Sequence, residues 1–168
     1  MKEKIVISLG SNSGDREQNI MSAISNLISK GFVPEKISSL YETEPVGFKD
    51  QNDFINAVIT GHFKGDPEKL LSTIKKVETD MGRVKSFRNG PRNIDIDIIL
   101  YGDRKVFKKE LTIPHKSYRE RKFVLEPLNE IEKDIADPET GKKISKMVSE
   151  CRDVSYIKKF GKIHEIQS

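Results

Sequence analysis

The pattern of apolar and polar positions divides the chain into strand-like and helix-like segments. Apolar residues alternate with other residues over positions 4–9 and 94–98, which predicts a half-buried strand in each stretch. Two more strands are expected over positions 36–42 and 54–63. Helical spacing predicts one helix capped by Ser13 or Asp15 and stopped by Gly31, and another that begins at Asp66 and is followed by Gly82.

These segments follow one another as strand, helix, strand, strand, helix, strand. This order favours an α+β, ferredoxin-like βαββαβ core, an antiparallel sheet with both helices on one face. Beyond it we expect a C-terminal extension with a short strand at 106–107, an extended segment at 111–115, helices at 119–125 and 144–149, and a polar tail over 158–168. We therefore expect residues 1–168 to form a single domain with its core at about 4–130.

Composition narrows the classes of protein. Lys and Arg number 30 against 26 Asp and Glu, so the net charge is +4, a modest basic balance that is compatible with nucleotide phosphates, with RNA or with no particular partner. Cys151 is the one cysteine, which excludes a disulfide framework within the chain and multi-cysteine zinc sites. The apolar runs are too short to span a membrane, and the first residues lead into a strand rather than a signal peptide, so we expect a cytoplasmic protein.

The strand over 94–98 carries the strongest candidate chemistry. Asp95 and Asp97 share one face, roughly 6.5 to 7 Å apart by Cα, so their oxygens can converge on hard cations. A solvated strand face would show the same alternation, but Arg83, Lys85, Arg88 and Arg92 come just before it. Arginines and divalent metals around anionic groups are the usual arrangement for phosphoryl transfer.

The strand over 54–63 offers a second kind of surface. It follows a connection over 43–52 that is longer than a hairpin needs, and long loops often carry function. Phe54 and Asn56 share one face, where an aromatic ring and an amide could bind a flat heterocycle. Core packing of Phe54 would explain the same pattern.

An ordered set of short motifs resembles the 6-hydroxymethyl-7,8-dihydropterin pyrophosphokinases of folate biosynthesis. The resemblance covers about residues 5–130. Its motifs are Leu9-Gly10-Ser11-Asn12 with Gly14-Asp15, Tyr41 to Gly47, Phe54-Ile55-Asn56-Ala57, Gly82-Arg83, Gly90-Pro91-Arg92, Asp95-Ile96-Asp97, Pro114-His115, Arg121, Phe123-Val124-Leu125 and Pro127-Leu128.

The resemblance implies transfer of pyrophosphate from ATP to the pterin hydroxymethyl group, with two Mg²⁺ ions. It implies that Asp95 and Asp97 bind metal and act in catalysis with Arg83 and Arg92. The ATP-binding positions that it implies are Glu78, Arg83, Lys85, Arg92, Ile98, Thr112, His115, Lys116 and Arg121. The pterin-binding positions that it implies are Thr43, Pro45, Val46, Phe54, Asn56, Asp95 and Phe123.

The sequence departs from the family pattern in the basic loop. Asn89 stands where some members carry tryptophan, and Lys85 where an arginine is common. Because lysine lacks the two-pronged guanidinium, we expect loop closure to depend more on Arg83, Arg88 and Arg92.

Two other functions fit parts of the pattern. An RNA-binding ferredoxin-like module would need an aromatic strand motif that is absent from the sequence, and Asp95 and Asp97 would repel RNA phosphates. A metal-dependent nucleotidyl transferase or nuclease would use the same aspartates, but the sequence has no extended basic track for nucleic acid. We therefore expect a monomer that binds ATP and the pterin, without nucleic acid or membrane partners.

Overall fold

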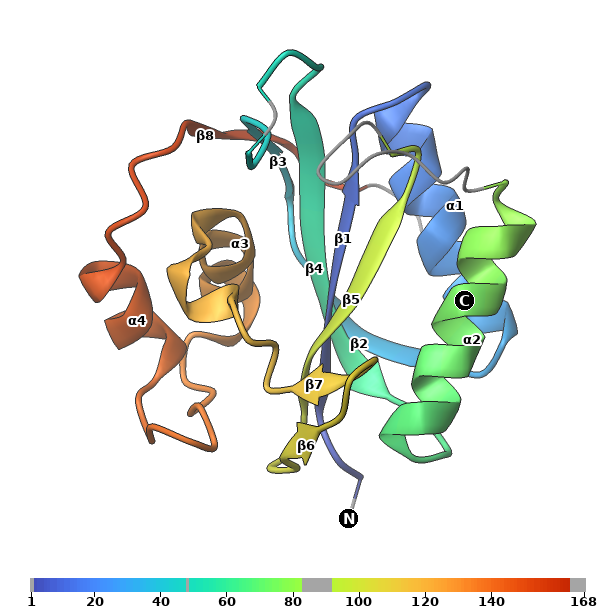
Figure 1. Cartoon of the computed structure of the whole chain (residues 1–168), viewed down its shortest axis with the longest axis vertical. Coiled ribbons are helices and arrows are strands. Elements are labelled where there is room, and N and C mark those ends of the chain that lie inside the picture. The colour runs from blue at the N-terminus through green and yellow to red at the C-terminus, as the bar shows by residue number, and fades with distance from the viewer. Residues whose placement is uncertain (1, 48, 83–91, 164–168) are drawn as a thin grey trace.

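An antiparallel sheet forms the centre of the computed structural model, which describes residues 2–47, 49–82 and 92–163 (Figure 1). Its strand order is β5-β1-β4-β3-β8, with β2 also paired to β4. The strands are β1 (Ile5–Ser11), β2 (Val33–Ile37), β3 (Leu40–Thr43), β4 (Phe54–His62), β5 (Asp95–Tyr101) and β8 (Ile157–Gly161). Strand β1 therefore lies between β5, which carries Asp95 and Asp97, and β4, which carries Asn56.

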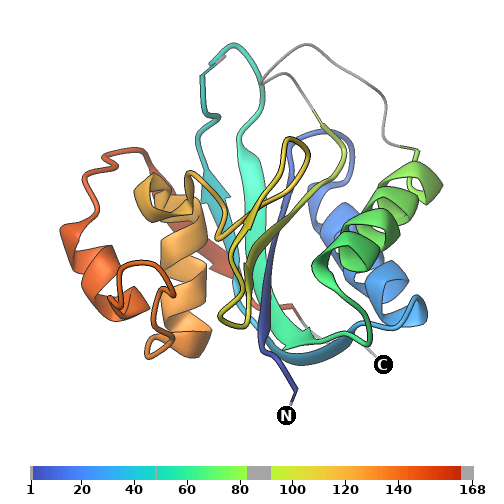
Figure 2. The same cartoon turned by 60° about the horizontal axis from the view of Figure 1, so that its bottom comes forward.

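Helices α1 (Arg16–Ser29) and α2 (Pro67–Asp80) cover one face of the sheet, as Figures 1 and 2 show. The Asp15 side chain accepts a hydrogen bond from the Gln18 amide, and the Asp66 side chain accepts one from the Lys69 amide. Such caps satisfy amide groups that have no partner within the helix. The predicted starts of both helices are confirmed. The apolar sides of α1 and α2 pack against the sheet and form the larger core with it. Members of this core include Ile7, Leu9, Ile24, Leu27, Ile59, Leu70, Ile74 and Ile96.

The opposite face is covered in part by α3 (Lys122–Glu132) and α4 (Ile144–Glu150), on the left in Figure 1. The prediction of a helix over 119–125 placed its end too early. A short 3-10 turn, η1 (Tyr118–Glu120), comes first, and α3 then continues past Pro127. The helix persists because its apolar side is buried in a second core, with Val6, Val58, Leu100, Tyr118, Val124, Leu125, Leu128, Ile144 and Met147.

The strand predicted over 36–42 is interrupted, so that prediction was wrong in part. Ser38 and Ser39 separate β2 from β3, and the Ser38 hydroxyl accepts a hydrogen bond from the Val58 amide at 2.9 Å. The next amide, that of Ser39, donates to Glu130 of α3 at 2.8 Å. The strand pairing is interrupted here because Glu130 of α3, a helix distant in the sequence, accepts the hydrogen bond of the Ser39 amide.

The predicted polar tail also contains regular structure. Residues 157–161 form β8, which pairs antiparallel with β3 at the edge of the sheet. The small hairpin of β6 (Val106–Phe107) and β7 (Thr112–Ile113) agrees with the extended segments expected there. None of the helices within the described ranges is long and apolar enough to cross a membrane.

Candidate functional site

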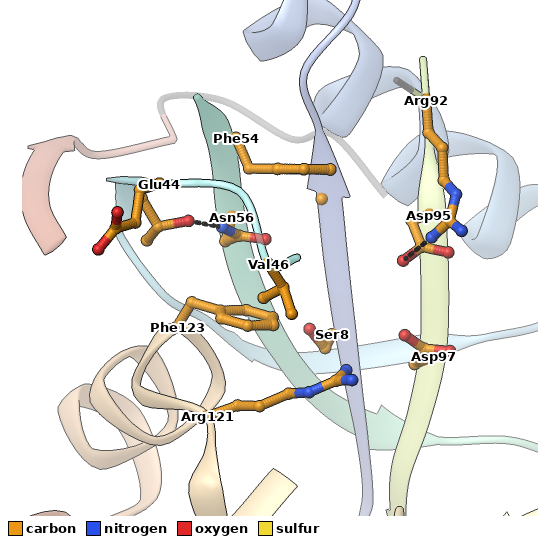
Figure 3. A pocket seen from close by; sticks show the side chains of 12 residues that line it. Ser8, Glu44, Val46, Phe54, Asn56, Arg92, Asp95, Asp97, Arg121 and Phe123 are labelled. Carbon is orange, nitrogen blue, oxygen red and sulfur yellow. Dashed lines mark hydrogen bonds and ion pairs between the residues drawn. The ribbon is translucent and has the colours of Figure 1, made fainter. Parts of the chain in front are cut away.

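A pocket opens on the sheet face that α3 and α4 leave uncovered (Figure 3). Strands β1, β4 and β5, the segment after β3 and the start of α3 all contribute side chains to it. Its lining is Ser8, Gly10, Thr43, Glu44, Val46, Phe54, Asn56, Arg92, Asp95, Asp97, Arg121 and Phe123. Most of these residues were predicted as site residues from the sequence.

The register of the sheet places the polar groups of the pocket in one row. Gly10 of β1 lies opposite Asn56 on one side and opposite Asp95 on the other, and Ser8 lies opposite Asp97. Opposed residues point to the same face of a sheet. A Cβ atom at Gly10 would lie only 2.6 Å from Oδ1 of Asn56. The missing side chain of Gly10 therefore makes room for the amide of Asn56.

One side of the pocket is aromatic and carries a fixed amide. Asn56 is buried and its Nδ2 donates to Oγ1 of Thr43 at 2.6 Å. Figure 3 shows Phe54 and Phe123 extending into the pocket from β4 and α3, with Val46 beside the Phe123 ring. Phe54 is only partly buried and belongs to the pocket lining, so the alternative of a core position does not hold.

The other side of the pocket is acidic. Asp95 and Asp97 point into it from β5, and Nη1 of Arg92 lies 3.4 Å from Oδ2 of Asp95 (Figure 3). Removal from bulk water, then the neighbouring charges of Asp95 and Glu78, raise the pKa of Asp97 to about 7, although Arg121 and Arg92 oppose this. Ionisation of Asp97 beside Asp95 is therefore unfavourable in free energy, and a bound cation would make it less so.

This carboxylate pair fits a magnesium site completed by a substrate. Mg²⁺ in nucleotide enzymes is commonly held by one or two carboxylates together with phosphate oxygens. Across the described parts of the chain, no cluster of three or more His, Cys, Asp or Glu side chains is arranged to hold a metal by itself. Asp95 and Asp97 would therefore need phosphate or water oxygens to complete the coordination.

A guanidinium lines the pocket, and the charge of that guanidinium acts on an imidazole outside the lining. Arg121 lines the pocket, with its guanidinium 5.6 Å from the centre of the Phe123 ring. Burial, together with the charge of Arg121, lowers the pKa of His115 to about 4, so this imidazole is neutral at pH 7. Its Nδ1 accepts a hydrogen bond from the Ser117 amide at 3.1 Å. The proton of the neutral ring is therefore on Nε2, where it can be donated.

Several predicted residues lie outside the lining. Pro45 borders an adjoining groove. Ile98 is buried in the larger core, and Thr112, His115 and Lys116 follow the far end of β5 in the chain. Glu78 of α2 is buried and its Oε2 accepts the Ile96 amide at 3.2 Å, at the outer edge of β5. Arg83, Lys85, Arg88 and Asn89 lie outside the described residues.

The sequence did not point to Ser8, Gly10, Glu44 or Asn12 as site residues. The Asn12 side chain accepts the Arg92 amide at 2.8 Å and donates to the Asn52 carbonyl at 3.0 Å. It thus joins the loop after β1 to the residue that precedes the acidic strand. In the sequence this place is marked by the cluster of turn-forming residues at 10–15.

Comparison with known proteins gives one consistent result. Residues 6–133 match the family of 7,8-dihydro-6-hydroxymethylpterin-pyrophosphokinase (HPPK). The 2-amino-4-hydroxy-6-hydroxymethyldihydropteridine pyrophosphokinase of Aquifex aeolicus is 42% identical over 134 residues, covering 80% of this chain and 83% of that protein. The folic acid synthesis protein fol1 of Pneumocystis carinii is 44% identical over 143 residues, covering 85% of this chain and 19% of that protein.

A solved structure shares the fold. Plasmodium falciparum HPPK-DHPS superposes with a TM-score of 0.72 at 16% identity, covering 89% of this chain and 44% of that one. The chain thus spans about a fifth of the fungal relative and less than half of the Plasmodium protein. The family match covers most of the chain. These findings show that the chain belongs to the 7,8-dihydro-6-hydroxymethylpterin-pyrophosphokinase family.

Proposed function

We propose that this protein transfers pyrophosphate from ATP to the hydroxymethyl oxygen of 6-hydroxymethyl-7,8-dihydropterin, giving AMP and the pterin diphosphate for folate synthesis. The observation that carries the proposal is a single pocket with an aromatic, amide-bearing side and an acidic side. A flat heterocycle and a metal-bound polyphosphate would meet between them. The names of the Aquifex relative and of the matching family agree with this reaction.

The aromatic side would hold the pterin. Phe54 and Phe123 offer rings for stacking, and the carbonyl oxygen of Asn56 is free to accept from the heterocycle because its Nδ2 is bound to Thr43. Val46 and Pro45 would close the outer wall. A buried amide held by a second side chain cannot rotate freely, so it selects one pattern of donors and acceptors.

The acidic side would hold Mg²⁺ and the triphosphate. Asp95 and Asp97 would be the protein ligands of two Mg²⁺ ions, whose charge would stabilise the transferring phosphoryl oxygens. Arg92 and Arg121 would contact phosphate oxygens, and the neutral His115 would donate through Nε2. Arg83 and Lys85 would add cationic groups from the loop before Arg92, with Glu78, Ile98, Thr112 and Lys116 on the nucleotide side.

The reaction needs the hydroxymethyl oxygen of the pterin in line with the bond of ATP that breaks. The hydroxymethyl oxygen attacks the β-phosphorus of ATP while the bond to the α-phosphate oxygen breaks, which releases AMP. Because Asn56 and Asp95 flank Gly10 on the same face of the sheet, a pterin ring bound at the Asn56 amide can have its substituent directed to the carboxylates. Positioning and charge stabilisation account for most of the catalysis of phosphoryl transfer.

We also propose that the core is ferredoxin-like and that the chain acts as a single-domain, cytoplasmic monomer. The strand order β5-β1-β4-β3 with α1 and α2 on one face supports the ferredoxin-like assignment. An acidic pocket and short basic segments favour small-molecule substrates over nucleic acid.

The test is a product analysis. The protein would be incubated with ATP, Mg²⁺ and the pterin, beside the same mixture with EDTA and beside Asp97→Ala. We expect AMP only when pterin and Mg²⁺ are both present, and at least a hundredfold loss in the variant. ADP as the product would instead indicate transfer of one phosphoryl group, and free pyrophosphate would indicate nucleotidyl transfer.

A further inference from the structure

A segment beyond the family match runs along the mouth of the pocket. Residues 153–161, which we name the brace segment, follow α4 and end in β8, whereas the family match ends at residue 133. In Figure 1 the chain after α4 passes above α3 and joins the sheet beside β3. Asp153, Ser155 and Ile157 are partly buried, while Val154 and Tyr156 between them are exposed. The inner side of the brace segment therefore faces the protein.

The brace segment caps the helix that carries Phe123. The residue at the N-cap position of α3 is Arg121, whose side chain makes no capping hydrogen bond. Instead, Oδ2 of Asp153 accepts the Lys122 amide at 3.1 Å. A carboxylate at a helix N-terminus satisfies a free amide and interacts favourably with the helix dipole. The capped residue lies directly between Arg121 and Phe123, both of which line the pocket.

Asp153 is itself held in place by its neighbours. Its Oδ1 accepts the Ser155 amide at 2.9 Å and the Ser155 hydroxyl at 2.5 Å. The Lys122 side chain reaches the Ser155 carbonyl at 3.4 Å. The first turn of α3 is thus fixed to the brace segment at more than one point.

The same segment holds the opposite wall of the pocket. The Tyr156 amide donates to Oε1 of Glu44 at 2.9 Å, and the Glu44 amide donates to the Tyr156 carbonyl at 3.4 Å. Thr43 pairs with Ile157 where β3 meets β8. Glu44 and Thr43 both line the pocket, and Thr43 accepts the hydrogen bond of Asn56. Four consecutive residues, 153–156, therefore connect the wall of Thr43 and Glu44 to the wall of Arg121 and Phe123.

A groove lies between these two walls and leads to the pocket. Its lining shares Glu44, Val46, Arg121 and Phe123 with the pocket, and adds Asp153 and Ser155 from the brace segment. The width of the opening is thus set by the short span from Asp153 to Tyr156. A ring bound against Phe123 needs that width to be constant.

We propose that Asp153 is a positioning residue for the pterin: by capping α3 from a distant part of the chain, it fixes Phe123 and Arg121 at the spacing from Thr43 and Asn56 that the flat substrate requires. This inference rests on the proposed function and adds to it a residue outside the family match. The effect should be greater for the pterin than for ATP, because Phe123 is proposed to stack on the pterin alone, whereas Arg121 is one of several proposed phosphate contacts.

The test compares three variants in steady-state kinetics with each substrate varied in turn. Asp153→Ala removes the cap, and we expect the KM for the pterin to rise about fivefold to tenfold, and the KM for ATP, which Arg121 contacts together with other cationic groups, to rise clearly less. Asp153→Asn retains an acceptor oxygen and should recover most of the loss. Glu150→Gln, an exposed residue of α4 that pairs with Lys142, is the matched control and should behave as the wild type.

Equilibrium binding makes the result independent of turnover. Pterin titrated calorimetrically into the protein with Mg²⁺ and α,β-methylene-ATP should show the same fivefold to tenfold weakening in Asp153→Ala. An unchanged pterin affinity, or an equal rise in both KM values, would overturn the inference. If Asp153→Ala did not fold, Asp153→Glu, which moves the carboxylate by one methylene, should weaken pterin binding, and wild-type affinity there would also overturn it.

Failure of the proposed function gives a different result. A wild-type protein that binds the pterin but forms no AMP would contradict the proposed reaction, and the comparison of binding constants would still decide the role of Asp153. A wild-type protein that does not bind the pterin would overturn both.

Discussion

At the scale of single residues, the pocket depends on a side chain that is absent. Gly10 lies in β1 between Asn56 and Asp95, the two residues proposed to contact opposite ends of the reacting system. Its backbone conformation is not restricted to glycine, since no positive φ angle is found there. Space alone therefore explains the glycine.

We expect Gly10→Ala to impair pterin binding without unfolding the protein. The new methyl group would lie 2.6 Å from Oδ1 of Asn56, so the amide must move away from Thr43. The KM for the pterin should rise by about tenfold or more, and the KM for ATP should change much less. Gly161→Ala is the control, because a Cβ there meets nothing within 4 Å. Equal effects of the two substitutions would contradict the steric explanation.

Asn12 binds the backbone of Arg92, which lies on the acidic side of the pocket. Its side chain accepts the Arg92 amide and donates to Oε1 of Gln51 at 2.8 Å, and it is almost fully buried. We expect Asn12→Ala to leave the Arg92 amide without this partner, to lower kcat at least tenfold and to destabilise the fold by about 1 to 3 kcal/mol.

Asn12→Asp separates the two roles of that side chain. The carboxylate can still accept from the Arg92 amide, but it cannot donate to Gln51 or to the Asn52 carbonyl. If the contact to Arg92 controls catalysis, Asn12→Asp should retain more kcat than Asn12→Ala while losing similar stability. Stability would be measured by urea unfolding and kcat by AMP release.

At the scale of elements, the turn after α3 fixes the approach to the pocket. Asp137 is buried and accepts hydrogen bonds from the Arg119 guanidinium, the Tyr118 hydroxyl and the Glu139 amide. Burial would raise the pKa of this carboxyl, but these bonds outweigh burial and lower the pKa to about 2. The turn is therefore tied to η1, the element that directly precedes Arg121.

The pKa of Asp137 gives a pH dependence of stability. Because the folded-state pKa lies below the unfolded value, the carboxylate stabilises the fold above about pH 4, and this contribution of about 2 kcal/mol is lost as the pH falls toward 2. We expect Asp137→Asn to lower the free energy of unfolding at pH 7, and the difference from the wild type to shrink between pH 4 and pH 2.5. Urea unfolding at each pH would show a constant difference if the charge were unimportant.

At the scale of the whole molecule, the sequence predicted what local patterns determine. The caps Asp15 and Asp66, and the alternation over 94–98, each lie within or beside the element that they specify. The interruption at Ser38, the strand β8 and the continuation of α3 depend instead on distant partners. Ser39 is bound by Glu130, and β8 exists because the edge of β3 is available to it.

The candidate site shows the same division. Asp95, Asp97 and Phe54 were predicted because charged or aromatic side chains on a strand are conspicuous, and Asn56 because its amide shares a strand face with Phe54. Gly10 and Ser8 were not, since their contribution is space and register, which only the assembled sheet defines. Asp153 lies 31 residues from the amide that it caps, and no local capping pattern reveals such a pair.

The acidic pair also affects the stability of the whole fold. Withdrawal from water and the charge of Asp95 raise the pKa of Asp97 to about 7, so the ionised pair opposes folding when no cation is bound. A carboxyl whose folded-state pKa is raised makes the protein less stable as the pH rises from about 4 to about 7. Sites built for function often carry a cost of this kind.

We therefore expect Asp97→Asn to be more stable than the wild type and inactive. At pH 8 without metal, the gain should be on the order of 2 kcal/mol, or roughly 4 to 8 °C in Tm. Asp134→Asn, at an exposed position beside Lys143, should change Tm by less than about 1 °C.

Mg²⁺ with α,β-methylene-ATP should then stabilise the wild type more than the variant, because only the wild type keeps both carboxylates for the cations. A variant less stable than the wild type at pH 8 would show that Asp97 contributes to folding, and that the pair is not strained by its function.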